Sequence, residues 1–159
     1  MKVVVDTNVA IVANGESDHA TINCEYECTT FLQKAVSRNS RIKIFLDESG
    51  LIFDEYKDHL SFRGQPKVGD MFFKYLHDHM YQGKKVQLVL IHKNNAIDRG
   101  FDELPINQLD RSDRKFLAVA VVSGADIVNA VDTDWHAERA LIDTLGITVQ
   151  QLCPDLACS

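Results

Sequence analysis

The sequence lacks a long hydrophobic run, and no apolar stretch approaches the roughly 20 residues that are needed to cross a bilayer. It also lacks the basic and then apolar start of a secretory signal, because a β-branched strand pattern begins at once, in residues 3–5. Both absences argue against membrane insertion and export. We therefore expect a protein without membrane partners that works in the cytoplasm.

Cysteine is present, but no C-x-x-C pair occurs among Cys24, Cys28, Cys153 and Cys158. Cytosolic thiols usually stay reduced, and structural zinc ligands normally lie closer together in the chain. We therefore expect unpaired thiols. A zinc site built from all four cysteines is the alternative.

Positive charge is scarce, with 17 lysines and arginines against 23 acidic residues and a formal net charge of −6. This balance argues against a protein that wraps nucleic acid along a broad basic face. It does not exclude a nuclease, because carboxylates that hold metal concentrate negative charge at one site, where bound cations reverse its local effect.

The remaining composition is that of an ordinary globular protein, with 45% hydrophobic and 25% charged residues in a chain of 159. This length suits one hydrophobic core better than two. We expect residues 1–159 to form a single domain.

Strand-like and helix-like segments alternate along the chain. Buried strands are predicted in the opening run of residues 2–13, where Asp6 stands at the carboxyl end of the strand, and in residues 41–47, 86–92 and 127–135, and helices in residues 24–39, 49–62, 71–84 and 112–126. Residues 138–152 predict a last helix and a short strand. Ser112 is the expected cap of its helix, and residues 93–110 form an irregular connection. The alternation predicts an α/β fold, a three-layer α/β/α sandwich with a mainly parallel central sheet.

Acidic residues stand where such a sheet places its functional site, beyond the carboxyl ends of the strands. Asp6 ends the first predicted strand, and Asp132 and Asp134 end a later one. Asp113 opens the helix between them, and Glu55 lies in the helix after the second strand. The topology predicts that these five acids converge on one rim.

Clustered carboxylates repel one another unless a cation compensates, and their hard oxygens suit Mg²⁺ or Mn²⁺. Such ions activate water for attack on phosphorus. Taken alone, each acid has a simpler interpretation: Asp6 as a helix cap, Asp113 as a charge near a helix start, the others as solvated acids. The joint placement favours phosphodiester hydrolysis.

The histidines are weaker candidates. His77 and His79 are two residues apart in a predicted helix, so they face different ways and are expected at the surface. His136 follows Asp134 closely enough to be a candidate proton shuttle.

The chain resembles the PIN-domain nucleases, a family that includes toxin-antitoxin ribonucleases and RNA-processing nucleases. The resemblance rests on VVVDTNV at the start, with Asp6 in the metal-binding place, and on SDRKFLAVAVVSGADIVNAVDTDW, with Asp113 and then Asp132 as metal-binding acids and Asp134 in support. Glu55 resembles the second acid of the family. Glu48 and Asp54 remain rivals for that role, and Asp110 is the rival of Asp113.

The resemblance implies a Mg²⁺- or Mn²⁺-dependent endoribonuclease that cuts single-stranded RNA. Asp6 and Asp113 would hold the ion, Glu55 and Asp132 would complete the cluster or orient water, and Asp134 would assist. The candidates for substrate contact are Thr7 and Asn8, which shape the turn around Asp6, with Arg111, Arg114 and Lys115. Many family members form homodimers and are held inactive by a small partner protein.

Residues 93–109 form a longer connection than a minimal toxin domain needs, and we expect them to contact the substrate or a partner. The main alternative function is a non-catalytic PIN-like module that binds RNA or protein. A haloacid dehalogenase-type phosphatase needs a second Asp where this chain has Asn8. A receiver domain needs paired acids and a late Lys that have no convincing equivalent here.

Overall fold

The centre of the molecule is a parallel sheet of five strands in the order β3-β2-β1-β4-β5. A computed structural model describes all residues from 1 to 159. The strands are β1 (Lys2–Val5), β2 (Lys43–Asp47), β3 (Val86–Val89), β4 (Asp126–Asn129) and β5 (Val149–Gln151). Their apolar side chains are largely buried because helices cover both faces, which is why β-branched runs form them.

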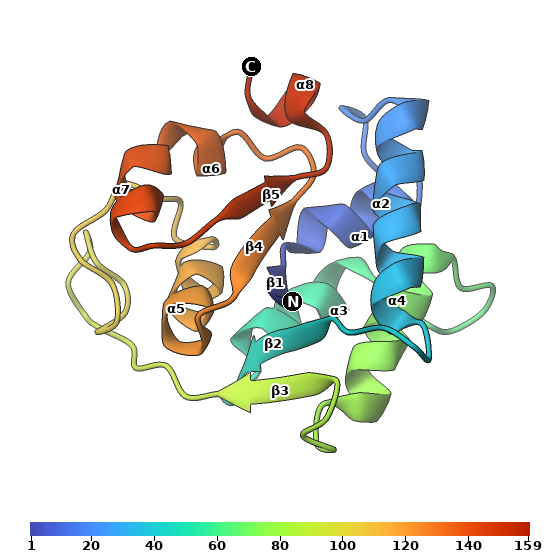
Figure 1. Cartoon of the computed structure of the whole chain (residues 1–159), viewed down its shortest axis with the longest axis horizontal. Coiled ribbons are helices and arrows are strands. Elements are labelled where there is room, and N and C mark those ends of the chain that lie inside the picture. The colour runs from blue at the N-terminus through green and yellow to red at the C-terminus, as the bar shows by residue number, and fades with distance from the viewer.

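Helices flank the sheet on both sides, as Figure 1 shows. They are α1 (Thr7–Ala13), α2 (Ile22–Val36), α3 (Leu51–His59), α4 (Val68–His79), α5 (Arg114–Ser123), α6 (Asp134–Ala137), α7 (Arg139–Thr144) and α8 (Pro154–Ala157). Helices α1, α2 and α4 pack together, while α5 lies against β1, β2 and β4. The predicted three-layer α/β/α sandwich is confirmed, and its sheet is entirely parallel.

The opening run of residues 2–13 holds the predicted strand, with Asp6 directly after it, and then a helix that the sequence analysis did not predict. The strand ends at Val5, and α1 begins at Thr7 because the Asp6 carboxylate accepts a hydrogen bond from the Asn8 amide at 3.0 Å and caps the helix. Val9 and Val12 of this helix are buried, three residues apart on one face. Tertiary burial here overrides the strand propensity of valine and isoleucine.

The start of α5 also differs from the prediction. Asp113, rather than Ser112, takes the N-cap position, and its side chain makes no capping hydrogen bond. Ser112 instead bonds to the Asp110 carboxylate through its amide and its hydroxyl. The Asp113 carboxylate is therefore left free to point toward other groups.

Gly69 lets α4 approach α1 closely. Its amide donates a 2.7 Å hydrogen bond to Oδ1 of Asn14, and a Cβ at this position would lie 2.1 Å from the Ala10 carbonyl oxygen. We expect Gly69→Ala to destabilise the fold by about 1–3 kcal/mol, the usual cost of overpacking. Thermal unfolding measures the loss, with Met71→Ala, an exposed position of the same helix, as the control. An unchanged melting temperature in Gly69→Ala would contradict this account of the helix contact.

None of the helices combines the length and the apolar character that a bilayer crossing requires.

Candidate metal centre

Three carboxylates meet beyond the carboxyl ends of β1 and β4. One oxygen each from Asp6, Asp113 and Asp132 lies within 4.8 Å of the others. Asp6 directly follows β1, Asp132 lies three residues beyond β4, and Asp113 opens α5, which packs against both strands. The winding of the parallel sheet therefore brings Asp6 together with two acids that lie more than 100 residues further along the chain.

Asp6 is buried and held from two sides. Its carboxylate accepts from the Asn8 amide at 3.0 Å and from the Trp135 indole N–H at 2.8 Å. Burial raises the pKa of Asp6 to about 7, with smaller contributions from the charges of Asp132 and Glu55, although the two hydrogen bonds oppose the rise. Trp135 is the single tryptophan of the chain, so its fluorescence reports on this carboxylate.

The pKa values of Asp113 and Asp132 are raised as well. Burial raises the pKa of Asp113 to about 8, and the charges of Asp6 and Asp132 add to the rise. The pKa of Asp132 is also raised, mainly by burial, although its carboxylate accepts a 2.9 Å hydrogen bond from the Asp134 amide. Two buried acids and one half-buried acid, all with raised pKa values, form a site that a divalent cation would stabilise. Carboxylate oxygens are ligands that Mg²⁺ and Mn²⁺ prefer.

Asp134 and Glu55 surround this triad. The half-buried Asp134 sits at the start of α6, and its charge helps to raise the pKa of both Asp113 and Asp132. Glu55 forms an ion pair with Lys115, and its charge reaches Asp6. All five acids that the sequence analysis placed on one rim are therefore within electrostatic reach of the cluster.

The rivals for these positions lie elsewhere. Glu48 and Asp54 are exposed, and neither is among the charges that act on the triad. The charge of the exposed Asp110 does reach Asp113 and Asp132, but no oxygen of Asp110 belongs to the triad, and its carboxylate is engaged by Ser112, which lowers its pKa. The geometry therefore selects Glu55 over the first two and Asp113 over Asp110.

Thr7 and Asn8 make contacts within the protein at the start of α1. The Asn8 side chain donates to Oδ1 of Asn129 at 2.8 Å and accepts from the Ala130 amide at 2.9 Å, so it joins the start of α1 to the end of β4. Thr7 is buried, and its hydroxyl has no hydrogen-bond partner. Asn8 therefore positions the loop that carries Asp132.

Asn129 and Trp135 are site residues that the sequence analysis missed. The Asn129 side chain donates to the Asp132 carbonyl and to Gln151 of β5, at 2.8 and 2.6 Å. Trp135 anchors Asp6. Trp135 could have been predicted as a site residue, because it is the lone tryptophan and directly follows Asp134, and a buried indole N–H normally needs a hydrogen-bond acceptor.

The three cationic candidates have different surroundings. Lys115 is paired with Glu55 and also donates to the Ser112 carbonyl. Arg114 is buried against the loop that precedes α5, and Arg111 is exposed. Only Arg111 has a side chain free of intramolecular hydrogen bonds.

The cysteines overturn one expectation. Cys24 of α2 and Cys153, which follows β5, form a disulfide across 129 residues of sequence. The expectation of unpaired thiols was therefore wrong for this pair, because the close approach of α2 to the chain end depends on the whole fold. Burial raises the pKa of the neighbouring Cys28 thiol to about 12, and Cys158 is exposed and free.

The histidines lie outside the triad. The ring of His77 contacts Asp78, and the ring of His79 contacts the Tyr75 carbonyl, so the two do not share a site. The half-buried His136 follows Trp135, and its ring contacts Arg139 at 3.2 Å.

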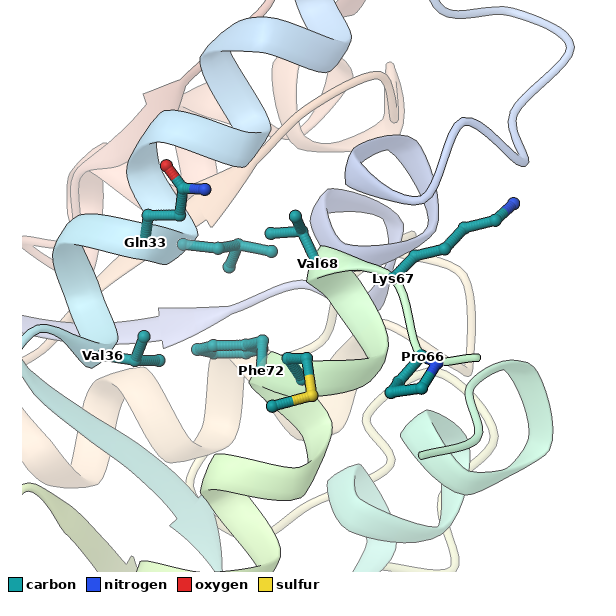
Figure 2. A pocket seen from close by; sticks show the side chains of 8 residues that line it. Gln33, Val36, Pro66, Lys67, Val68 and Phe72 are labelled. Carbon is teal, nitrogen blue, oxygen red and sulfur yellow. The ribbon is translucent and has the colours of Figure 1, made fainter. Parts of the chain in front are cut away.

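A separate hollow of about 330 Å³ lies between α2 and α4. Figure 2 shows that Val36 of α2 and Phe72 of α4 face each other across it. Its walls are mostly apolar and include no acid. The hollow therefore has no part in the carboxylate cluster.

Comparisons with family models, with curated proteins and with solved structures found no match for the chain. Any inference about function accordingly depends on the chemistry of the cluster and on the sequence motifs that supply it.

Proposed function

We propose that the chain is a PIN-like, divalent-metal-dependent endoribonuclease that hydrolyses phosphodiester bonds of single-stranded RNA. The observation that carries the proposal is the convergence of Asp6, Asp113 and Asp132, whose carboxylate oxygens lie within 4.8 Å of one another although three different segments supply them. Raised pKa values at Asp6 and Asp113 support it, because perturbed acids gathered at a strand-end rim are typical of functional sites.

The three acids of the triad would hold Mg²⁺ or Mn²⁺. A bound ion of this kind supplies an activated water and neutralises charge on the leaving oxygen of a phosphodiester. The Trp135 N–H holds Asp6 in place, and the Asp134 amide does the same for Asp132, so the ligands are oriented by their neighbours.

Glu55 and Asp134 complete the acidic rim. Glu55 is half-buried, and its ion pair with Lys115 fixes its carboxylate near Asp6. It is our candidate for orienting the attacking water and accepting its proton, with Asp134 assisting. The cytoplasmic location, an inhibitory partner protein and a homodimer belong to the same proposal through the PIN-like resemblance.

The direct test incubates the purified protein with a mixed pool of single-stranded and duplex RNAs in Mn²⁺, Mg²⁺ or EDTA. We expect cleavage of single-stranded RNA that requires the metal, together with a metal-dependent change in Trp135 fluorescence. A fluorescence change without cleavage of any RNA would favour the non-catalytic binding module instead. No fluorescence change and no cleavage would reject the metal centre itself.

A further inference from the structure

A pocket of about 410 Å³ lies beside the start of α5, and its lining is positively charged although the chain as a whole is acidic. The loop after β3 and the residues before α5 form its walls, and the lining side chains include three cations and no acid: Lys93, Asn94, Asn95, Ala96, Ile97, Gly100, Phe101, Arg111 and Arg114. This volume falls within the usual range of ligand pockets. In a chain of net charge −6, such a gathering of cations calls for an explanation.

Arg114 is the most informative of these residues, because it is only 7% exposed and has no carboxylate partner. Its guanidinium donates to the carbonyl oxygens of Leu109 at 3.1 Å and Ile97 at 2.6 Å. These neutral acceptors satisfy hydrogen bonds, and Arg114 forms no ion pair, although its charge reaches the exposed Asp110 and lowers the pKa of that carboxyl. A buried cation without an ion-pair partner is costly, so the pocket favours an anion.

The two exposed cations of the pocket strengthen this bias. Lys93 and Arg111 form no ion pair, and both reach the same hollow as Arg114. The charge of Arg114 lowers the pKa of the nearby Asp110, but Asp110 is exposed, forms no ion pair and accepts hydrogen bonds from Ser112 through Oδ1. The positive charge of the pocket is therefore available to a ligand.

The pocket has a firm wall. A Cβ at Gly100 would lie 2.8 Å from Cδ of Arg114, so the loop is packed directly on this side chain. The Asn94 side chain is engaged by Asp102 and by the Ala96 amide, whereas the side-chain amide of Asn95 and the apolar, exposed Ile97 offer further contacts of the kind a nucleotide uses.

We infer that the pocket of Lys93, Arg111 and Arg114 binds a phosphate group of the RNA strand. This phosphate lies one or a few nucleotides along the strand from the phosphodiester bond that would be cleaved at the triad. Arg114 directly follows Asp113 in the chain, which sets the pocket beside the candidate metal centre. The assignment of RNA as the source of the phosphate rests on the proposed function. The proposed contacts are between the cationic side chains and the sugar-phosphate backbone of the RNA, so they position the strand and carry no sequence preference.

The test measures binding of a fluorescein-labelled single-stranded RNA by fluorescence anisotropy in EDTA, which removes divalent metal and so prevents cleavage at the proposed metal centre. Arg114 is left intact because it also holds the loop. The double variant Lys93→Ala/Arg111→Ala is compared with Arg41→Ala/Lys84→Ala, which removes the same charge just before β2 and β3, at the amino ends of these strands and away from the loop that follows β3.

We expect the pocket variant to bind at least tenfold more weakly and to lose roughly 0.7 in the salt slope for each phosphate contact removed. Equal affinities and equal slopes in the two double variants would overturn the inference, and so would an absence of RNA binding by the wild type. Stabilisation by inorganic phosphate through Lys93 and Arg111, without RNA binding, would overturn the RNA assignment in favour of a small anion.

Failure of this inference is distinguishable from failure of the proposed function. Metal-dependent cleavage with the same KM in the pocket variant would reject the pocket and leave the nuclease standing. RNA binding in EDTA that depends on Lys93 and Arg111, without cleavage in Mn²⁺, would support the pocket and reject the nuclease.

Discussion

Asp113→Asn is expected to abolish RNA cleavage and, in the absence of metal, to make the protein more stable. The variant keeps the size of the side chain but removes a charge that Asp6 and Asp132 oppose. Loss of a metal-binding carboxylate should lower cleavage by at least about 100-fold, the upper end of the cost of losing an outer-shell partner. The two effects together separate a functional cluster from a structural one.

The stabilisation follows from the raised pKa of Asp113. At pH 7 the unfolded chain ionises this group freely, whereas the folded protein opposes its ionisation until about pH 8. At 1.36 kcal/mol per pKa unit, linkage gives a gain of about 2–4 kcal/mol when the charge is removed. A chain of this length then melts roughly 5 °C or more higher.

Thermal unfolding in EDTA and in Mn²⁺ measures both sides of this prediction. The wild type should gain stability from Mn²⁺ by mass action, and Asp113→Asn should lose most of that gain. Asp18→Asn, a change of the same chemistry at an exposed position, should match the wild type in both conditions. A fall in the metal-free melting temperature of Asp113→Asn would show that the carboxylate supports the fold, contrary to our account.

The acids of the triad could be located from the sequence because each stands at a topologically defined point. Asp6 and Asp132 follow strands, and Asp113 opens the helix that packs on those strands. Because the strands are parallel, their carboxyl ends lie at the same end of the sheet, which brings the three acids together. The same reasoning predicted the fold, which the structure confirms. Position along strands and helices is thus enough to place carboxylates at a rim.

Contacts that depend on side-chain packing could not be located in this way. The Trp135 bond to Asp6 spans 129 positions, and so does the Cys24–Cys153 disulfide. Asn129 reads as one more residue of a strand, yet its amide organises the Asp132 loop. These partners depend on the exact meeting of distant segments, for which neither spacing nor residue type carries a local signal.

The helix over residues 7–13 escaped prediction for a related reason. Its valines and isoleucine favour strands locally, but the Asp6 cap and the burial of Val9 and Val12 select a helix. The error matters for the site, because a helix that starts at Thr7 places the Asn8 amide within 3.0 Å of the Asp6 carboxylate.

The metal-free protein is expected to become less stable as the pH rises from about 4 to about 8. Asp6 and Asp113 have folded-state pKa values of about 7 and about 8, above the ordinary value, so the folded protein binds these protons more tightly than the unfolded chain does. Their contribution to stability is complete below the unfolded pKa of about 3.9 and is lost as the pH rises through the folded values. The expected slope is about 1 kcal/mol or more per pH unit.

Urea unfolding in EDTA across this pH range measures that slope. The opposite contributions of Asp78, Glu103 and Asp110, whose pKa values are lowered, fall below about pH 5, so the slope is read between about pH 5 and about pH 8. Saturating Mn²⁺ should flatten or reverse the slope, because the metal binds the deprotonated carboxylates and competes with the protons. Asp113→Asn should reduce the slope in EDTA, whereas Asp18→Asn should leave it unchanged. A metal-free stability that rises with pH over this window would mean that the three acids are not forced together as their geometry requires.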